Sequence, residues 1–128
     1  MYYQSSIITP ANTPESNALD TELVITLGTI HNVLVGFPPG PQGLLHCRIL
    51  DKGWSLVPWT LGESIAFDNF VYNLIFDYPV VVEPFRLSIL TWNLDTNYSH
   101  ALWVGVSMSE GTPDTSLLDF IKSLQKVA

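Results

Sequence analysis

Charged residues are scarce in this chain. Asp, Glu, Lys and Arg make up 13% of its 128 residues, about half of the roughly 25% typical of soluble domains. A small domain needs polar side chains to cover its surface, so this shortage indicates that another chain covers part of it. A surface rich in Ser, Thr and Asn is the alternative, because these residues are plentiful. We favour an oligomer or a subunit of an assembly.

Basic residues are the scarcest of the charged ones. Five Lys and Arg against twelve Asp and Glu give a net charge of −7. The five form no cluster that could neutralise phosphates, so the sequence predicts neither direct nucleic-acid binding nor attachment to an anionic membrane. Residues 23–47 are uncharged, but prolines and a glycine at 38–41 interrupt them. The interruption comes well before the roughly 20 apolar residues that a membrane-spanning helix needs.

Cysteine is nearly absent as well. Cys47 is the single cysteine, so no disulfide can form within the chain. It lies in an alternating apolar segment, where we expect a small buried side chain. The first residues lack the basic start and apolar stretch of a signal peptide. These features predict synthesis in a reducing cytoplasm.

Short stretches of alternating apolar and polar residues fill most of the chain. Residues 36–58, GFPPGPQGLLHCRILDKGWSLVP, read as strand, rigid Pro/Gly turn, strand, Gly turn and strand. Similar stretches follow at 85–92 and 102–108, and residues 65–67 are expected to pair briefly within a loop. About eight short strands with no helix between them predict an all-β antiparallel sandwich, jelly-roll-like in type.

The chain divides into three predicted parts. Residues 1–20 form an N-terminal arm or extension, in which residues 2–9 are either a short strand or an arm. Residues 21–110 form the β-sandwich domain, and residues 111–128 a C-terminal α-helix. The apolar residues of the last part share one helical face. This helix either folds back on the sandwich or docks on a neighbouring subunit.

Recognisable catalytic patterns are missing. His31, His46 and His100 have no metal-ligand spacing, and no C-x-x-C, G-x-S-x-G or phosphate-binding loop occurs. His46 adjoins Cys47, so the two side chains leave opposite faces of a strand and make a poor nucleophile–base pair. We expect no enzyme activity, no cofactor and no metal. Distant strands could still assemble a cupin-like metal site or a carboxylate pair, and both alternatives stay open.

Residues 93–97, NLDTN, resemble the first half of a calcium-binding loop. The sixth position holds Tyr98 and the twelfth Val104, where such a loop needs glycine and glutamate. Asn and Asp readily adopt turn conformations and bond their own backbone. The sequence therefore predicts a polar hairpin turn here.

Four tryptophans are many for this length. Trp103 alternates with the apolar Leu102 and Val104, so we expect it to be exposed or at an interface. Exposed aromatic side chains on a sandwich either anchor a subunit interface or stack on sugar rings. The low charge favours an interface, for which we predict Phe37, Pro38, Pro39, Trp54, Trp59, Trp103, Leu117, Leu118, Ile121 and Leu124.

Two parts of the sequence resemble small β-sandwich structural proteins of tailed bacteriophages. The first is the strand and turn series at 35–40, 43–49 and 53–58. The second is Leu87 to His100, where Trp92, Asn93 and Asp95 open a turn. The resemblance implies a virion component without an active site, either a capsid decoration (cement) protein or a tail-associated subunit. The N-terminal extension and the C-terminal helix depart from the family pattern.

The function predicted on this basis is stabilisation of a virion through subunit contacts, foremost as a capsid decoration protein. Its expected partners are other copies of itself and virion proteins such as the major capsid protein. It would be made in the host cytoplasm and reside in the virion. The alternative is a carbohydrate- or receptor-binding module of a tail spike or fibre, in which the tryptophans would stack on glycan.

Overall fold

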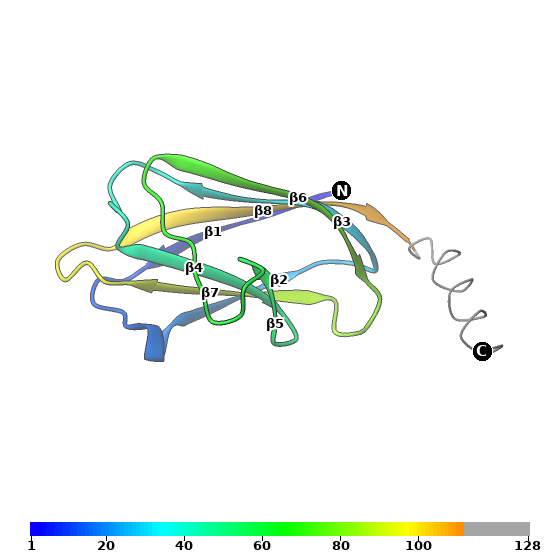
Figure 1. Cartoon of the computed structure of the whole chain (residues 1–128), viewed down its shortest axis with the longest axis horizontal. Coiled ribbons are helices and arrows are strands. Elements are labelled where there is room, and N and C mark those ends of the chain that lie inside the picture. The colour runs from blue at the N-terminus through cyan, green and yellow to red at the C-terminus, as the bar shows by residue number, and fades with distance from the viewer. Residues whose placement is uncertain (112–128) are drawn as a thin grey trace.

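The computed structural model describes residues 1–111, which form an all-β fold (Figure 1). The prediction of an antiparallel all-β protein is confirmed. The predicted C-terminal helix, with its interface residues, falls on residues 112–128 and lies outside the described residues. The elements are β1 (Tyr2–Thr9), the 3₁₀ turn η1 (Glu15–Asn17), β2 (Leu19–Val24), β3 (Gly28–Phe37), β4 (Leu45–Asp51), β5 (Trp54–Val57), β6 (Phe70–Val80), β7 (Arg86–Asn93) and β8 (His100–Glu110).

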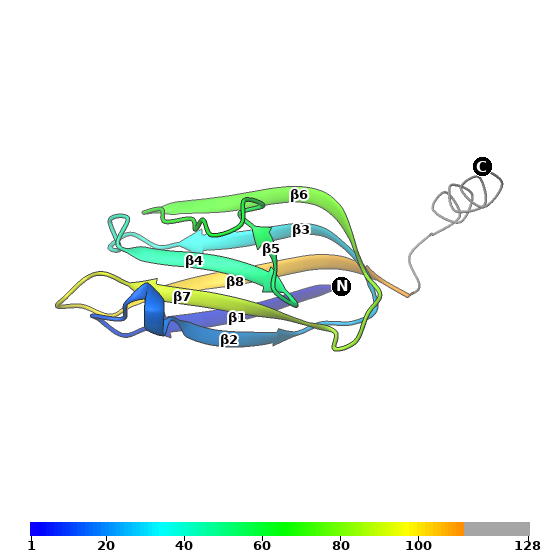
Figure 2. The same cartoon turned by 60° about the horizontal axis from the view of Figure 1, so that its bottom comes forward.

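The strands form two four-stranded antiparallel sheets stacked face to face (Figures 1 and 2). We call β1-β8-β3-β6 sheet A and β2-β7-β4-β5 sheet B. The outermost strands of sheet A are β1 and β6, and those of sheet B are β2 and β5. Strands that follow one another along the chain mostly lie in different sheets.

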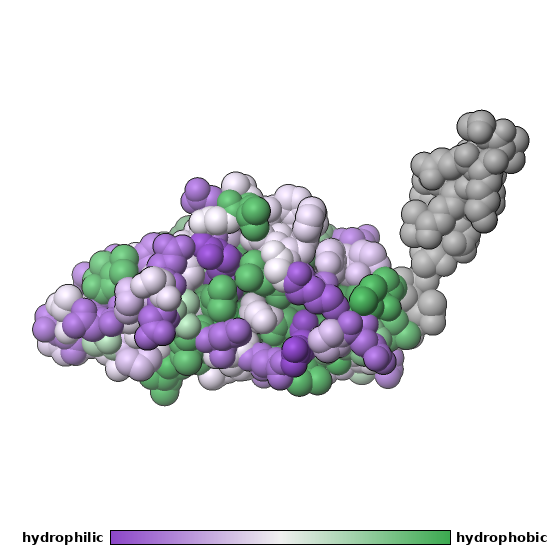
Figure 3. Space-filling model, turned by 90° about the horizontal axis from the view of Figure 1, so that it is seen from below, coloured by the Kyte–Doolittle hydropathy of each residue, from purple (hydrophilic) through white to green (hydrophobic). Residues whose placement is uncertain are grey.

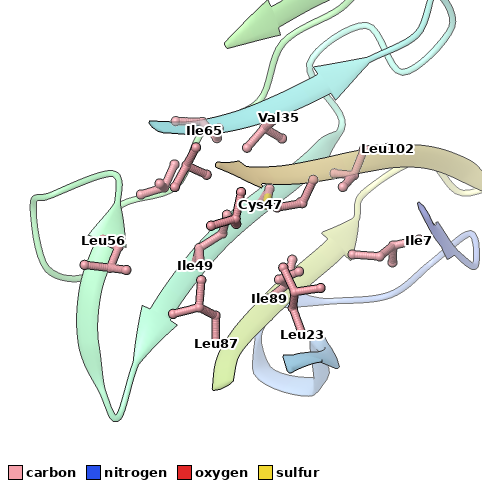
Figure 4. Packing of buried hydrophobic residues seen from close by; sticks show 14 of the residues in the cluster. Ile7, Leu23, Val35, Cys47, Ile49, Leu56, Ile65, Leu87, Ile89 and Leu102 are labelled. Atoms are coloured by element: carbon pink, nitrogen blue, oxygen red, sulfur yellow. The ribbon is translucent and has the colours of Figure 1, made fainter. Parts of the chain in front are cut away.

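The core lies between the sheets, where every second side chain points inward. In β4 the inward set is Leu45, Cys47 and Ile49, all fully buried. Figure 4 shows side chains from both sheets meeting there. Cys47 is buried as predicted, and its burial in apolar surroundings raises the pKa of the thiol to about 12.

The first residues are part of the sandwich, so of the two alternatives for residues 2–9, a short strand or an arm, the structure shows the strand. β1 pairs with β8 along its whole length, from Tyr2 opposite Ser107 to Thr9 opposite His100. Its alternate residues Ile7 and Thr9 are buried beneath the sheet. Burying these side chains and completing the ladder on β8 stabilise the segment in place.

The polar turn predicted at 93–97 exists, but it joins the two sheets and is not a hairpin. Asp95 accepts a hydrogen bond from the backbone N–H of Asn97 at 2.9 Å, and its other carboxylate oxygen lies 2.7 Å from His100 Nε2. Asn93 Nδ2 donates to the Tyr98 carbonyl at 2.9 Å. These bonds fix the crossover from β7 to β8. The hydrogen bond from Asn97, and next that of His100, lower the pKa of Asp95.

Candidate interaction site

The outer face of sheet B carries charge of both signs. Asp20 and Glu22 project from β2, Arg86 from β7 and Arg48 from β4. Arg86 forms an ion pair with Glu22, and Arg48 Nη2 lies 3.0 Å from Glu15 Oε1 of η1. Figure 3 views this side of the molecule and shows hydrophilic residues spread across it among apolar ones. This surface is well suited to contact with water.

The outer face of sheet A is almost free of charge. Its residues alternate with the buried ones along each strand. Within the described part of the chain, Asp77 is the one carboxylate among them, and it lies 2.9 Å from His31. We call this surface the uncharged face. It consists of Tyr2, Gln4, Ser6 and Ile8 on β1; Ala101, Trp103, Gly105, Ser107 and Ser109 on β8; Thr29, His31, Asn32, Leu34 and Gly36 on β3; and Val71, Asn73, Ile75, Asp77 and Pro79 on β6.

Two aromatic side chains lie over strand glycines on the uncharged face. A Cβ atom added at Gly36 would come within 2.0 Å of the Trp103 ring, and one at Gly105 within 2.1 Å of the Tyr2 hydroxyl. The absence of side chains at these glycines lets the rings lie close to the sheet. The centre of this face therefore presents aromatic and small polar groups.

An apolar groove lies on the side of the sandwich where β5 and β6 are the outermost strands. It has a volume of about 370 Å³ and is lined by Trp59, Tyr72, Leu74, Phe76 and Asp77. A second hollow of about 190 Å³ adjoins it through Trp59 and is also lined by Trp54 and Leu61. We call the two together the aromatic groove. Of the described residues that line it, Asp77 is the one with a charged side chain.

The segment between β5 and β6 builds this groove. β5 ends at Val57, directly before Pro58, which cannot continue a strand ladder. Ile65 then pairs with Cys47 of β4 through two backbone hydrogen bonds of 2.9 Å, so the brief pairing predicted here is confirmed. Trp59 packs edge-on against Phe76, with ring centroids 6.2 Å apart. The groove remains because the four-residue β5 is much shorter than the eleven-residue β6.

A hydrogen bond near one end of the groove connects the two sheets. Tyr78 of β6 donates its hydroxyl to Asp51 Oδ2 of β4 at 2.6 Å, and Lys52 Nζ lies 2.9 Å from Asp51 Oδ1. Partial burial, and next the bond to the carboxylate, raise the pKa of Tyr78 well above its usual range. Tyr78 therefore keeps its proton and donates this hydrogen bond to Asp51.

An aromatic cluster around Phe67 lies at the other end of β6. Phe67 stacks on Tyr72 with centroids 5.8 Å apart and meets Phe70 at 5.0 Å and Phe37 at 5.9 Å. This cluster packs the first residues of β6 against the core. The groove is thus held at both ends of β6.

The three histidines lie in separate places. His31 bonds Asp77, His46 bonds Ser64 Oγ at 2.9 Å, and His100 bonds Asp95. Within residues 1–111, no three His, Cys, Asp or Glu side chains are grouped to hold a metal ion. His46 also stacks on Trp92 at 5.3 Å, and its burial lowers its pKa against an opposing effect of Glu15. Its bond to Ser64 anchors residues 58–69 over β4.

The predicted interface residues occupy different places. Trp54 and Trp59 come together at the aromatic groove, with exposures of 60% and 59%. Trp103 lies on the uncharged face, and Pro38 and Pro39 lie exposed in the β3–β4 connection. Phe37 is only 2% exposed and packs in the core, so its side chain does not contribute to the surface. Leu117, Leu118, Ile121 and Leu124 lie outside the described residues.

The sequence analysis missed the β6 residues of the groove. Tyr72, Leu74 and Phe76 are spaced at every second position, which indicated an ordinary core-facing strand. No local sequence signal distinguishes them, because the position of β6 at a sheet edge, where its inward face is only half covered, follows from the strand pairing.

Comparison with models of known protein families finds no match, and comparison with curated proteins finds no significant one. The resemblance to phage structural proteins therefore stays a prediction. Among the described residues, no helix is long and apolar enough to span a membrane.

Proposed function

We propose that this protein is a structural subunit of a bacteriophage virion, foremost a capsid decoration protein. It acts by covering neighbouring subunits with its uncharged face and aromatic groove. The single observation that carries the proposal is the unequal distribution of charge between the two outer faces. Removing a charged group from water costs several kcal/mol unless it is paired, so the face without charge is the one best suited to burial.

The charged face of sheet B would then remain in solvent. Its Glu22–Arg86 and Glu15–Arg48 pairs are already satisfied within the chain. A subunit that binds only the assembled particle stabilises that state by mass action, in proportion to how tightly it binds. Such a role needs an apolar contact surface and no reactive group.

We further propose that the sandwich is a jelly roll. The support is its nested strand pairing, in which β1 pairs with β8, β2 with β7, β3 with β6 and β4 with β5. A long antiparallel hairpin rolled over on itself has this pairing. Jelly rolls form many viral capsid domains, although lectin domains and cupins also use them.

The test is binding to expanded, empty capsids of the phage that encodes the protein. Purified protein should co-sediment with these capsids, saturate at a fixed number of copies and raise their resistance to heat. Capsids that gain neither bound protein nor stability would contradict a decoration role.

Glycan binding is the second candidate, and the exposure of Trp54 and Trp59 beside the groove favours it. Sugar rings stack on such aromatic faces. Titration with host polysaccharide should then change the tryptophan fluorescence, and Trp59→Ala should remove most of that change. An unchanged spectrum at saturating polysaccharide would reject this candidate.

A further inference from the structure

Strand β6 has one edge that is unpaired in the part of the chain that the structure describes. It pairs with β3 on one side and with no other strand of the described residues, and Figure 2 shows it as the outermost strand of sheet A. Such an edge presents free backbone N–H and C=O groups to any strand that can align with it. Natural proteins commonly protect such edges with lysine, proline or a bulge.

Those protections are missing from the first part of β6. Residues 70–76 contain no charged residue and no proline, and their register with β3 is unbroken from Phe70 to Ile75. The irregularity in the ladder comes later, and so does Pro79. Ile75 points outward and is 76% exposed, and Val71 on the same face is half exposed. An exposed, regular and apolar edge of this kind favours pairing with another strand.

The sequence of β6 is complementary to itself in the antiparallel direction. Centred on Asn73, it places Val71 opposite Ile75 of a second copy, and Ile75 opposite Val71. On the inner face Phe70 meets Phe76 of the second copy, and Tyr72 meets Leu74. Apolar and aromatic residues that face each other across strands stabilise the pairing.

Neighbouring registers fit less well. Antiparallel partners must point to the same side of the sheet, so the strand can slip only in steps that keep this alternation. A slip in one direction places Asp77 opposite Val71, and a slip in the other places it opposite Phe67. In the register centred on Asn73, Asp77 faces Asn69 of the second copy, just before its β6 begins. This register alone pairs the apolar residues without burying the carboxylate against them.

We propose that two copies of this chain join through β6 about a twofold axis at Asn73. The two four-stranded A sheets then form one continuous sheet, and their uncharged faces lie side by side on the same surface. A self-complementary patch of this kind gives a closed dimer. The inference rests on the proposed assembly role for its purpose, but it concerns the isolated protein and can be tested without any capsid.

Cysteine cross-linking in the full-length protein tests the axis. Asn73→Cys should form a disulfide-linked dimer under mild oxidation, because the introduced thiol would face its own equivalent in the second copy. Asn32→Cys is the matched control, since Asn32 bonds Asn73 at 3.2 Å on the same face but lies one strand further from the edge. Native Cys47 is fully buried and adds no background. A mixture of Val71→Cys and Ile75→Cys proteins should also cross-link, whereas each alone should not.

Charge pairs test the register independently. The double variant Val71→Lys/Ile75→Lys places like charges opposite each other twice and should weaken dimerisation about tenfold. Val71→Lys/Ile75→Glu carries the same number of new charges but places opposite signs together, and should dimerise almost as well as the native protein. Sedimentation equilibrium measures both, and circular dichroism verifies that both fold.

Three results would overturn the proposal. One is a monomer whose β6 amide protons exchange freely, which would leave the edge to another protein. The second is a monomer whose β6 amides are protected until residues 112–128 are deleted, which would assign the edge to the chain's own C-terminal segment. The third is equal cross-linking of the Asn73→Cys and Asn32→Cys proteins. None of these results decides capsid binding, so the two proposals can fail separately.

Discussion

The two outer faces of this sandwich differ more than its two sheets do. Both sheets have four antiparallel strands and share one core. Sheet B carries charge of both signs on the outside, most of it in ion pairs. Among residues 1–111, the outer face of sheet A presents one carboxylate, Asp77, among aromatic, amide and hydroxyl groups. The few charged residues of the chain therefore lie mostly away from the outer face of sheet A. The composition indicates that some surface is covered, and the structure identifies the outer face of sheet A as the surface to test.

The largest effect should come from adding one carboxylate to each face. Leu34 and Leu90 are both half-buried and point outward from the middle of sheets A and B. Leu34→Glu should weaken capsid binding about 30-fold or more, because burying an unpaired charge at an interface costs roughly 2 kcal/mol or more. Leu90→Glu should change it less than about threefold, because Asp20 and Arg48 flank that position on the face that we propose stays in solvent. Co-sedimentation with capsids measures both.

Equal loss of binding in the two variants would show that sheet A is not the contact face. Unfolding in urea provides the control, because both proteins must be folded at the temperature of the binding assay.

A second prediction concerns the hydrogen bond that joins the sheets beside the groove. Tyr78→Phe should lower the free energy of unfolding by about 1–2 kcal/mol, since the lost bond has a charged acceptor but is only partly buried. The raised pKa of Tyr78 adds a pH dependence. The unfolded tyrosine loses its proton near pH 10 and the folded one only at higher pH, so stability falls as the pH rises above about 10.

Urea unfolding between pH 8 and 11 measures both parts of this prediction. The native protein should lose stability at the alkaline end, and Tyr78→Phe should lose less. Parallel curves for the two proteins would contradict the assigned role of the phenol.

A third prediction concerns the turn that carries the chain from sheet B to sheet A. The lowered pKa of Asp95 means that the folded state binds its proton less readily than the unfolded state. Its contribution to stability is present above the unfolded pKa, near 3.9, and is lost as the pH falls through the folded pKa. Asp95→Asn should flatten the acid limb of the stability curve. An acid limb unchanged by Asp95→Asn would contradict the prediction.

The smallest effect should come from removing the one carboxylate of the uncharged face. Asp77→Asn breaks an exposed contact with His31, and such surface pairs contribute little, so unfolding should change by less than about 0.5 kcal/mol. Glu22→Gln, which breaks the exposed pair with Arg86 on the other face, is the matched control. A change well above 1 kcal/mol for Asp77→Asn would mean that the contact is stronger than a surface pair.

Local alternation sufficed to predict most strands of this fold. Trp103 alternates with Leu102 and Val104, and the structure places it outward as expected. Phe37 alternates with Val33 and Val35, which indicated the core, and it is buried there although we also expected it at an interface. For that residue the spacing was the better guide, because an inward position in a central strand leaves no exposed surface.

The features that depend on strand pairing could not be predicted in the same way. β1 is stabilised by β8, which begins at His100, and no local signal links the two. The uncharged face appears only when four separate strands come together, since each alone shows ordinary alternation. The contact of Trp59 with Phe76 likewise depends on how residues 58–69 cross between sheets. Contacts between segments far apart in the sequence therefore form both the uncharged face and the aromatic groove.

The position of β8 has a consequence for biosynthesis. A ribosome releases the chain from its N-terminus, yet β8 lies between β1 and β3 in sheet A. Until residues 100–110 leave the exit tunnel, β1 lacks the one strand that it pairs with among residues 1–111. Folding dominated by such distant partners takes milliseconds to seconds. During synthesis, β1 and the edge of β3 that later pairs with β8 are therefore unpaired, and chaperones or other strands can bind them.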